Sequence, residues 1–324
     1  MPVDLHKQLP QCDFFYLIRG KEREALNFFQ KNGCKTVISI RNKYAKRRFE
    51  RFLIGYNENR HELYFSFYNI ASSQRIRHYE LLLKLMYGKK ISKKIYKIVY
   101  PNNYLEKFKK IIQPFSKAKK IIIGYKNDIK RIIRKIYKRI PDIDIEDDFF
   151  SLSYYKNERL IITGHAFGWM MKEIILSLLR MVKIRQVFYI GNCGTLEDLK
   201  IGQIIFPNNL FYLGRRKIVV NNILFPQNNY SIRHLSVSTP FVETHNFITE
   251  NRKKYKTIDV ELYDIAKNIL NTNKNIKLGI ALLVSDKPGK KENKASVCNE
   301  YYFQRSLQQV LEEIIKLVLP NESR

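Results

Sequence analysis

The sequence is poor in acidic residues, in cysteine and in long apolar runs, and each shortage excludes a class of protein. Its 324 residues contain 4 cysteines, and no two of these have the short spacing of a zinc cluster or a disulfide framework. No run of about 18 apolar residues could span a membrane, and the N-terminus lacks the cationic start and apolar stretch of a signal peptide. These features predict a soluble, cytoplasmic protein without a metal or disulfide scaffold.

The shortage of acidic residues leaves a net charge of +29, from 59 Lys and Arg against 30 Asp and Glu. Such an excess is typical of proteins that bind nucleic acid, an anionic membrane or a phosphorylated ligand. Here, however, the basic residues are spread along the chain and interleave with apolar ones, as on solvated helix faces. Lys is also abundant together with Ile, Asn and Tyr, which is the bias of AT-rich codons. We therefore expect neither a nucleic acid nor a membrane partner.

A change of pattern divides the chain near residue 117. Before it, apolar runs alternate with helical stretches, and the segment from Ser72 to Gly88 reads as a capped helix. The segments "YPNNY" and "QPFSKAKK" interrupt both the strand-like and the helix-like spacing of apolar residues, and they mark the boundary. We predict an α/β or α+β domain of unknown role over residues 1–117 and a second domain over residues 118–324.

The second region alternates strands with helices, which predicts an α/β fold with a three-layer arrangement and a mixed, largely parallel central sheet. Its clearest unit is βαβ: the apolar runs Leu160–Thr163 and Val187–Ile190 are each followed by glycine, and an amphipathic helix lies between them. Ligands of open parallel sheets bind beyond the carboxyl ends of the strands, where these glycine turns are expected. No G-x-G-x-x-G fingerprint occurs, so no dinucleotide cofactor is predicted.

Acidic and polar side chains follow buried strands at several points of this region. Asp259 and Glu261 leave a short strand and open a helix, and Ser285 and Asp286 follow a long apolar run. Partial burial at a strand end raises the pKa of an acid and fixes its direction, which suits proton transfer or the binding of sugar hydroxyls. Any one such acid is more often a helix cap or turn former.

The order of the motifs gives them more weight. "GHAFG", "GNCG", "DLKIGQIIFP", "TPFVET", "DVE" and "VSD" follow one another in this half of the chain. In this order they resemble motifs of the nucleoside phosphorylase and nucleosidase superfamily, which includes purine nucleoside phosphorylase, uridine phosphorylase and methylthioadenosine/S-adenosylhomocysteine nucleosidase. The resemblance covers roughly residues 118 to 320. It implies the phosphorylase/hydrolase-like fold and cleavage of a nucleoside's N-glycosidic bond without a cofactor.

The resemblance also implies roles for single residues. Asp286 matches the acid that protonates the departing base, with Ser285 to orient it, and Glu261 matches the carboxylate that grips the ribose hydroxyls. A carboxylate beside the developing cationic sugar would also stabilise it electrostatically. The remaining matches are to the base slot (Phe241 and Val242), to the sugar face (Val260) and to the backbone at the reacting centre (Gly191, Asn192 and Gly194).

The departures from the family pattern bear on the nucleophile. In the phosphorylases an arginine and a serine bind phosphate where this chain has Tyr189 and Asn192, and Asp128 stands where a further arginine would align. Losing two cationic ligands for a dianion costs several kcal/mol, so phosphorolysis is disfavoured. If the loop after Gly124 is shifted, nearby cations could bind phosphate in place of the missing arginines: Lys126, Lys130 and Arg131.

With water as the nucleophile, Asp259 matches the first glutamate of the nucleosidase E-M-E motif, and Asn192 could be a second ligand of the water. We therefore predict hydrolysis of a purine nucleoside or a 5'-modified purine nucleoside by a homo-oligomeric enzyme. Three alternatives stay open: a phosphate-dependent phosphorylase, a protein that binds a nucleoside or nucleotide without catalysis, and a nucleosidase acting on an AMP-type nucleotide.

Overall fold

The computed structural model divides into two compact units, Met1–Tyr104 and Leu105–Arg324, and each is described by itself. Among the described residues, no helix is both long and apolar enough to cross a membrane. The structure describes residues 14–19, 22–34, 36–41, 51–67, 95–99, 104–146, 150–164, 169–213, 216–224, 232–237, 245–273, 275–288 and 301–319.

The first unit is built on a five-stranded sheet with the order β2-β3-β4-β1-β5. β1 pairs in parallel with β4 and β5, whereas β2, β3 and β4 form an antiparallel meander. Helix α2 packs on the sheet through Phe29, whose ring lies against Tyr64. The helix expected between Ser72 and Gly88 lies outside the described residues. The elements are β1 (Phe14–Arg19), α2 (Glu22–Lys31), β2 (Thr36–Arg41), β3 (Arg51–Asn57), β4 (Glu62–Phe67) and β5 (Ile95–Val99).

The second unit contains an 11-stranded mixed sheet within the described part of the chain. Its central strands β6, β9, β10 and β16 run parallel, while β7, β8, β11, β13 and β15 each pair antiparallel with a neighbour. The predicted mixed α/β sheet is confirmed, with parallel pairing at its centre and antiparallel pairings around it. The strands are β6 (Lys120–Ile123), β7 (Ile143–Glu146), β8 (Ser151–Tyr155), β9 (Leu160–Thr163), β10 (Gln186–Thr195), β11 (Ile204–Ile205), β12 (Asn209–Tyr212), β13 (Arg216–Val219), β14 (Arg233–Ser236), β15 (Thr257–Asp259) and β16 (Lys277–Asp286).

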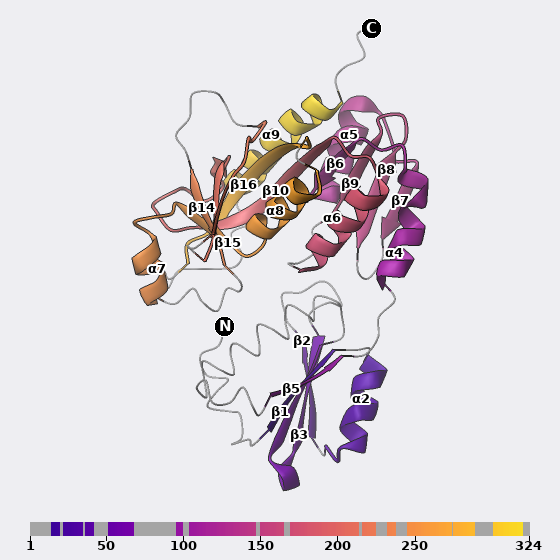
Figure 1. Ribbon diagram of the computed structural model, residues 1–324, viewed down its shortest axis with the longest axis vertical. Helices are drawn as coiled ribbons and strands as arrows, with labels where there is room; N and C mark the ends of the chain where they lie inside the picture. Colours follow the sequence, from indigo (N-terminus) through magenta and orange to yellow (C-terminus); the bar gives the residue numbers. More distant parts are fainter. Residues whose placement is uncertain are drawn as a thin grey trace. The chain divides into compact units, whose positions relative to one another are not determined.

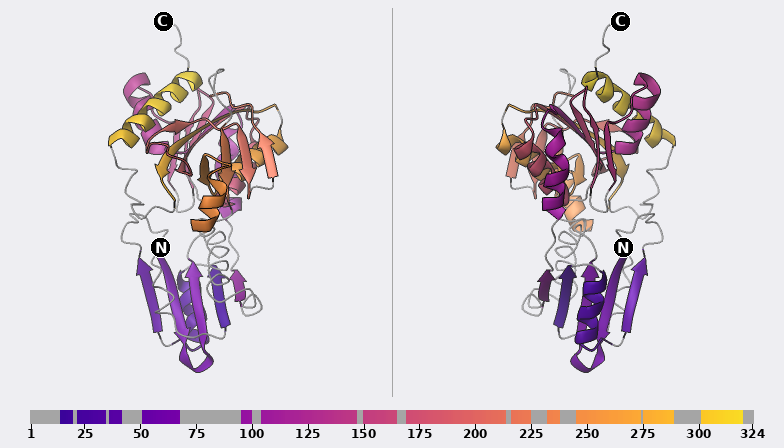
Figure 2. Two further views of the ribbon diagram at one scale, coloured as in Figure 1. Left: turned by 90° about the vertical axis from the view of Figure 1, so that its left-hand side faces the viewer. Right: turned by 90° about the vertical axis from the view of Figure 1, so that its right-hand side faces the viewer.

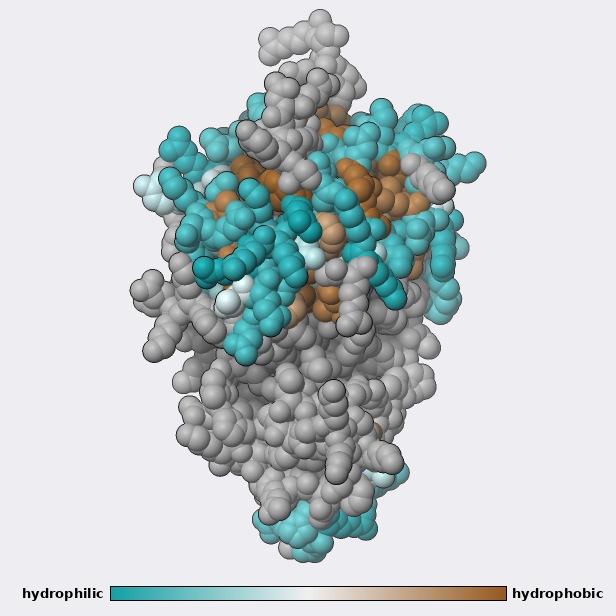
Figure 3. All heavy atoms as spheres, turned by 60° about the vertical axis from the view of Figure 1, so that its left-hand side comes forward, coloured by the Kyte–Doolittle hydropathy of each residue, from teal (hydrophilic) through white to brown (hydrophobic). Residues whose placement is uncertain are grey.

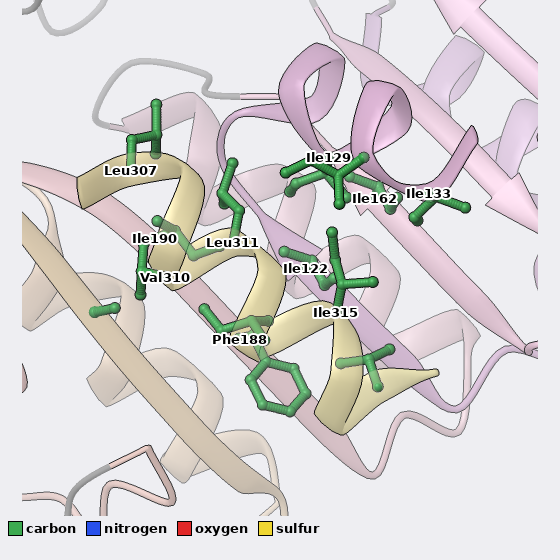
Figure 4. Packing of buried hydrophobic residues seen from close by; sticks show 14 of the residues in the cluster. Ile122, Ile129, Ile133, Ile162, Phe188, Ile190, Leu307, Val310, Leu311 and Ile315 are labelled. Carbon is green, nitrogen blue, oxygen red and sulfur yellow. The ribbon is translucent and has the colours of Figure 1, made fainter. Parts of the chain in front are cut away.

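Helices cover both faces of this sheet, which makes three layers (Figures 1 and 2). α5 and α9 pack together on one face, where Ile129 and Ile315 meet Ile122 and Phe188 of the strands (Figure 4). α6 and α8 pack against each other on the opposite face. The helices are α4 (Tyr104–Ile112), α5 (Lys126–Tyr137), α6 (Trp169–Met181), α7 (His245–Asn251), α8 (Leu262–Thr272) and α9 (Tyr301–Val318).

Hydrophilic side chains cover much of the face of the second unit seen in Figure 3, with apolar patches between them. Amphipathic helices on the outside of the sheet contribute hydrophilic surface of this kind, because they bury one side and keep the other in water. α5 is such a helix: Ile129, Ile132 and Ile133 are buried, whereas Arg134 and Lys135 are exposed.

Strand β10 changes its partner along one edge, and this positions the site. On one side it pairs with β16 from Gln186 to Gly194. On the other side Gln186–Tyr189 pair with β6, and Gly194 and Thr195 pair with β15. Among the described residues, no strand pairs with residues 190–193 on that second edge. In open α/β sheets such a change of strand order creates a crevice at the carboxyl ends of the strands.

One local prediction was wrong. The glycine turn expected at Gly191 to Gly194 is part of β10, because β16 pairs with this segment and keeps it extended. This extension depends on a strand distant in the sequence, which the local composition does not indicate. The acidic segment after α5 contains strand β7, which pairs with the next strand, β8, from Ile143 to Glu146.

Candidate functional site

Three strands bring their ends together at Gly194 of β10. This residue pairs with Ile258 of β15 on one side and with Asp286 of β16 on the other. A β-carbon at position 194 would lie 2.6 Å from Pro288 and 3.2 Å from Ile258, so the close approach requires glycine. The acids predicted at two separate strand ends therefore lie on either side of one strand.

Asp286 is the last residue of β16 and is partly buried. The register of β10 and β16 shifts after Cys193, so that Gly194 pairs with Asp286 and Ser285 is passed over. Ser285 Oγ donates to Asp286 Oδ1 at 2.7 Å and also lies 3.3 Å from the Cys193 carbonyl oxygen. Burial raises the pKa of Asp286, and the hydrogen bond from Ser285 opposes the shift. A carboxyl of raised pKa at a strand end is suited to act as a proton donor.

Cys193 lies between two glycines of β10 and is buried. Burial raises the pKa of its thiol well above the usual range, and the carboxylates of Asp259 and Asp286 raise it further. A thiol in such surroundings stays protonated and is a poor nucleophile. The contribution of Cys193 is therefore packing, and its electrostatic contacts show that the two acids lie near the same point of the strand.

Tyr189 is buried on β10 and covers Gly191. A β-carbon at position 191 would lie 2.7 Å from Tyr189 Cε1 and 2.8 Å from its hydroxyl oxygen, so the ring occupies the space beside the glycine. Burial raises the pKa of Tyr189 well above its usual value, and the nearby carboxylates of Glu261 and Asp259 add to the shift. The phenol is therefore neutral and lies within electrostatic reach of both acids.

Asp259 ends β15 and is held by the surrounding chain. Ser236 Oγ donates to Oδ1 at 2.6 Å, and the Leu262 amide donates to Oδ2 at 3.0 Å. His234 Nε2 lies 3.0 Å from Oδ1 without the alignment of a hydrogen bond, while His234 Nδ1 is 2.9 Å from Thr257 Oγ1. Asp259 thus anchors the first turn of α8 to the end of β15, and each oxygen accepts one bond from the chain.

Glu261 lies between Asp259 and the start of α8, where it is partly buried. It occupies the position before the first helical residue, and its charge contributes to the raised pKa of Tyr189 on β10. Val260 is also partly buried and packs against the cluster of Leu235, Val237 and Ile258. The three residues of this motif therefore differ in their surroundings. Asp259 is anchored by hydrogen bonds, Val260 makes apolar contacts, and Glu261 acts electrostatically on Tyr189.

Asn192 is exposed on the segment of β10 that changes partner. Its Oδ1 accepts a hydrogen bond from the hydroxyl of Tyr125, which follows β6 and precedes α5. This bond connects the end of β6 to β10. Tyr125 was not among the predicted site residues, although its position directly after the strand-ending Gly124 is a signal that could have indicated it.

The cations that could replace missing phosphate ligands are each paired with an acid. Lys126 is buried and lies 3.0 Å from Asp144 Oδ1 and 2.6 Å from Glu146 Oε1. Lys130 also binds Asp144. Burial would raise the pKa of Asp144, but hydrogen bonds from Lys130, Ser153 and Lys126 lower it to about 2, so its charge is present at neutral pH.

Arg131 forms an exposed pair with Asp128, at 2.8 Å and three residues apart on α5. Exposed pairs of this kind contribute little to stability and leave the guanidinium in contact with water. Asp128, which stands where the resemblance aligns an arginine, thus binds Arg131.

The structure brings most of the predicted residues together. The charges of Glu261 and Asp259 both raise the pKa of Tyr189, and those of Asp259 and Asp286 both raise the pKa of Cys193, so the acids of β15 and β16 act on the same strand, β10. No group of three His, Cys, Asp or Glu side chains suited to a metal is present among the described residues. Phe241, Val242 and the segment 165–168 of "GHAFG" lie outside the described residues.

The sequence analysis also missed the two side chains that support Asp259 from β14, namely His234 and Ser236. Both are fully buried or nearly so, and they face Asp259 because β14 and β15 pair in parallel with Ser236 opposite Asp259. No sequence signal fixes this register, since it depends on how two separate strands align.

No family model matches the chain, and no curated protein matches it. Among solved structures, the chain is similar to the methylthioadenosine/S-adenosylhomocysteine nucleosidase of Chlamydia trachomatis, at 12% identity and a TM-score of 0.44, over 62% of this chain and 99% of that one. It is similar to the purine nucleoside phosphorylase of Toxoplasma gondii, at 11% identity and a TM-score of 0.47, over 64% and 92%. It is also similar to isoform 2 of the uridine phosphorylase of Schistosoma mansoni, at 12% identity and a TM-score of 0.47, over 65% and 89%.

Proposed function

We propose that the second unit hydrolyses the N-glycosidic bond of a purine nucleoside or a 5'-modified purine nucleoside. Asp286 donates a proton to the departing base, which leaves neutral. The raised pKa of Asp286 supports this role, because an acid near the reaction must be protonated at the working pH. Ser285 fixes the direction of the carboxyl through its hydrogen bond at 2.7 Å.

Glu261 binds the ribose hydroxyls and stabilises the positive charge that develops on the sugar. Its position at the start of α8, near the buried and neutral Tyr189, supports this role. A carboxylate in partly desolvated surroundings interacts more strongly with a developing cation than it would in water. Phe241 and Val242 complete the base slot in this proposal, and Val260 the sugar face.

Water is the nucleophile, placed by Asn192 and Asp259. Asp259 also anchors the turn from which Glu261 projects, since its two oxygens accept bonds from Ser236 and Leu262. Each oxygen of a carboxylate offers two lone-pair sites, so Asp259 retains capacity to accept a bond from water.

The observation that carries hydrolysis over phosphorolysis is the neutral, buried ring of Tyr189 over Gly191. A phosphate dianion in a partly buried site needs cationic ligands. At this place the chain provides a phenol, and the cations Lys126, Lys130 and Arg131 are each bound to an acid.

The test is base release from adenosine, inosine, methylthioadenosine and AMP, each with and without inorganic phosphate, followed by chromatography of the base and the sugar. We expect free base and free sugar at rates that phosphate does not change. Strict dependence on phosphate, with a sugar phosphate as product, would show a phosphorylase instead. A clear preference for AMP over adenosine would assign the nucleotide nucleosidase activity.

Two variants test the roles of the acids. Asp286→Asn and Glu261→Gln are each expected to lower kcat by about 100-fold or more, since a general acid contributes about 10²–10⁴ and an electrostatic stabiliser about 10²–10³. Glu313→Gln is the matched control, because Glu313 lies exposed on α9 and pairs only with Lys316 in the described structure. Thermal stabilisation by nucleosides without any base release, equal in wild type and Asp286→Asn, would instead assign a binding protein.

A further inference from the structure

Tyr125 holds an unusual backbone position at the end of β6. Its φ is +47° and its ψ is +36°, in the left-handed region that residues other than glycine, asparagine and aspartate rarely adopt. It directly precedes Lys126, the first residue of α5, and its carbonyl oxygen accepts the bond from the Ile129 amide. This conformation turns the chain from the strand into the helix, and it sets the direction in which the side chain of Tyr125 leaves the backbone.

The phenol of Tyr125 reaches across to the open segment of β10. Its hydroxyl donates to Asn192 Oδ1, a residue 67 positions later in the sequence. The ring is itself held, since it packs against the apolar cluster formed by α5, α9 and the sheet. Asn192 is exposed, so without this bond its amide could rotate in water.

The hydrogen bond determines which side of the amide remains available. An asparagine amide has one accepting oxygen and one nitrogen with two donor hydrogens. The oxygen of Asn192 accepts from Tyr125, and its nitrogen makes no hydrogen bond to any of the described residues. In the structure the amide is oriented with its oxygen toward the phenol. Asn192 therefore presents donors, not an acceptor, at the edge of β10 where the site lies.

We infer that Tyr125 is a positioning residue that orients the amide of Asn192 so that its nitrogen donates to the nucleophile. The inference rests on the proposed function for its catalytic consequence. A donated bond occupies one lone pair of the water and leaves the second for attack on the anomeric carbon. As the C–O bond forms, the C–N bond breaks and its electrons go to the base, which takes a proton from Asp286. The proton lost by the water passes to a carboxylate of the site, because Asn192 cannot accept it.

The kinetic test compares Tyr125→Phe with Tyr137→Phe. Tyr137 lies on α5, is partly buried and packs against the same apolar cluster, so its substitution controls for loss of a phenol from this region. A net hydrogen bond corresponds to a change of about 3- to 10-fold. Tyr125→Phe should lower kcat by that factor and leave KM for the nucleoside unchanged, whereas Tyr137→Phe should change neither.

Substitutions of Asn192 test the direction of the bond. Asn192→Asp keeps the acceptor for Tyr125 but replaces the two donors with an acceptor, and we expect at least a tenfold larger loss of kcat than for Tyr125→Phe. Tyr125→Phe combined with Asn192→Ala should be no slower than Asn192→Ala alone, since the phenol acts through the amide. Three results would each overturn the inference. Tyr125→Phe could have the kcat of the wild type, Asn192→Asp could retain activity, or the losses of the two single variants could multiply in the double variant.

A readout without activity separates this inference from the proposed function. In ¹⁵N-labelled protein, the side-chain amide signals of Asn192 are identified by their absence in Asn192→Ala. They should shift in Tyr125→Phe and stay in place in Tyr137→Phe. If the wild type releases no base, the proposed function fails, but the side-chain amide signals still test whether Tyr125 forms a hydrogen bond with Asn192. Unchanged signals in Tyr125→Phe would refute the positioning role even in an active enzyme.

Discussion

Replacing Asp286 with asparagine should make the protein more stable at neutral pH, although it removes the proposed acid. Burial raises the pKa of Asp286, which means that the folded protein holds the charged form less well than water does. Asparagine has nearly the same shape and no charge, so it avoids this cost. It can still accept the hydrogen bond that Ser285 donates to Oδ1.

The magnitude and its pH dependence follow from linkage. Below pH about 4, near the pKa of an unfolded aspartate, both states are protonated and the two proteins should have similar stability. As the pH rises through the raised pKa of the folded state, the wild type loses about 1.4 kcal/mol for each unit by which that pKa exceeds the unfolded value. The advantage of Asp286→Asn should therefore develop across this window and then stay constant.

Ser285→Ala should act in the opposite direction. It removes the hydrogen bond that favours the charged carboxylate, so it should raise the pKa of Asp286 further. At pH values above that pKa, where the carboxylate is charged, the loss should cost about 1.5–3 kcal/mol. In the Asp286→Asn background the same bond is between neutral groups, and its loss should cost only about 0.5–1.5 kcal/mol.

The assay is urea unfolding at pH values from 4 to 8 for wild type, both single variants and the double variant. Glu313→Gln is the control, because an exposed substitution should stay within about 0.5 kcal/mol throughout. The reasoning fails if Asp286→Asn is less stable than wild type at pH 8 while equal to it at pH 4. It also fails if the effect of Ser285→Ala is the same in both backgrounds.

Two further substitutions test the packing and the anchoring of the site. Gly191→Ala should destabilise the protein by about 1–3 kcal/mol in thermal unfolding, because the new methyl group would lie 2.7 Å from the buried Tyr189 ring; a variant as stable as wild type would show that the ring can move away. Asp259→Ala should cost about 2–4 kcal/mol in urea unfolding, because it leaves the Ser236 hydroxyl and the Leu262 amide without their acceptor. Asp259→Asn should lose less, and a loss below about 0.5 kcal/mol for Asp259→Ala would contradict the anchoring role.

Elements that depend on local patterns could be predicted from the sequence. The apolar run before Gly124 and the amphipathic pattern after it indicated β6 and α5, and both are present. The helix between β9 and β10 was predicted in the same way and is confirmed. In each case the period of apolar residues within one segment carries the information.

Features that depend on distant partners could not be predicted. β10 continues through Gly191 because β16 pairs with it. β15 runs antiparallel to β10, although the other two neighbours of β10, β6 and β16, run parallel to it. The bond from Tyr125 to Asn192 needs both the left-handed turn and the open edge of β10. None of these follows from a period or a motif, since each depends on a register that the whole sheet sets.

The change of partner along β10 also bears on how the site forms during synthesis. Its residues come from the ends of β6, β10, β15 and β16, and β16 is the last strand of the described chain. Pairings between segments so far apart in sequence form late and slowly, because loop closure costs entropy before the contacts compensate it. A nascent chain stopped before Lys277 can build the strand that carries Asn192 but lacks β16, the partner that keeps it extended. The residues at the ends of β15 and β16 therefore come together only when synthesis has nearly reached α9, so under the proposed function partly synthesised chains would release no base.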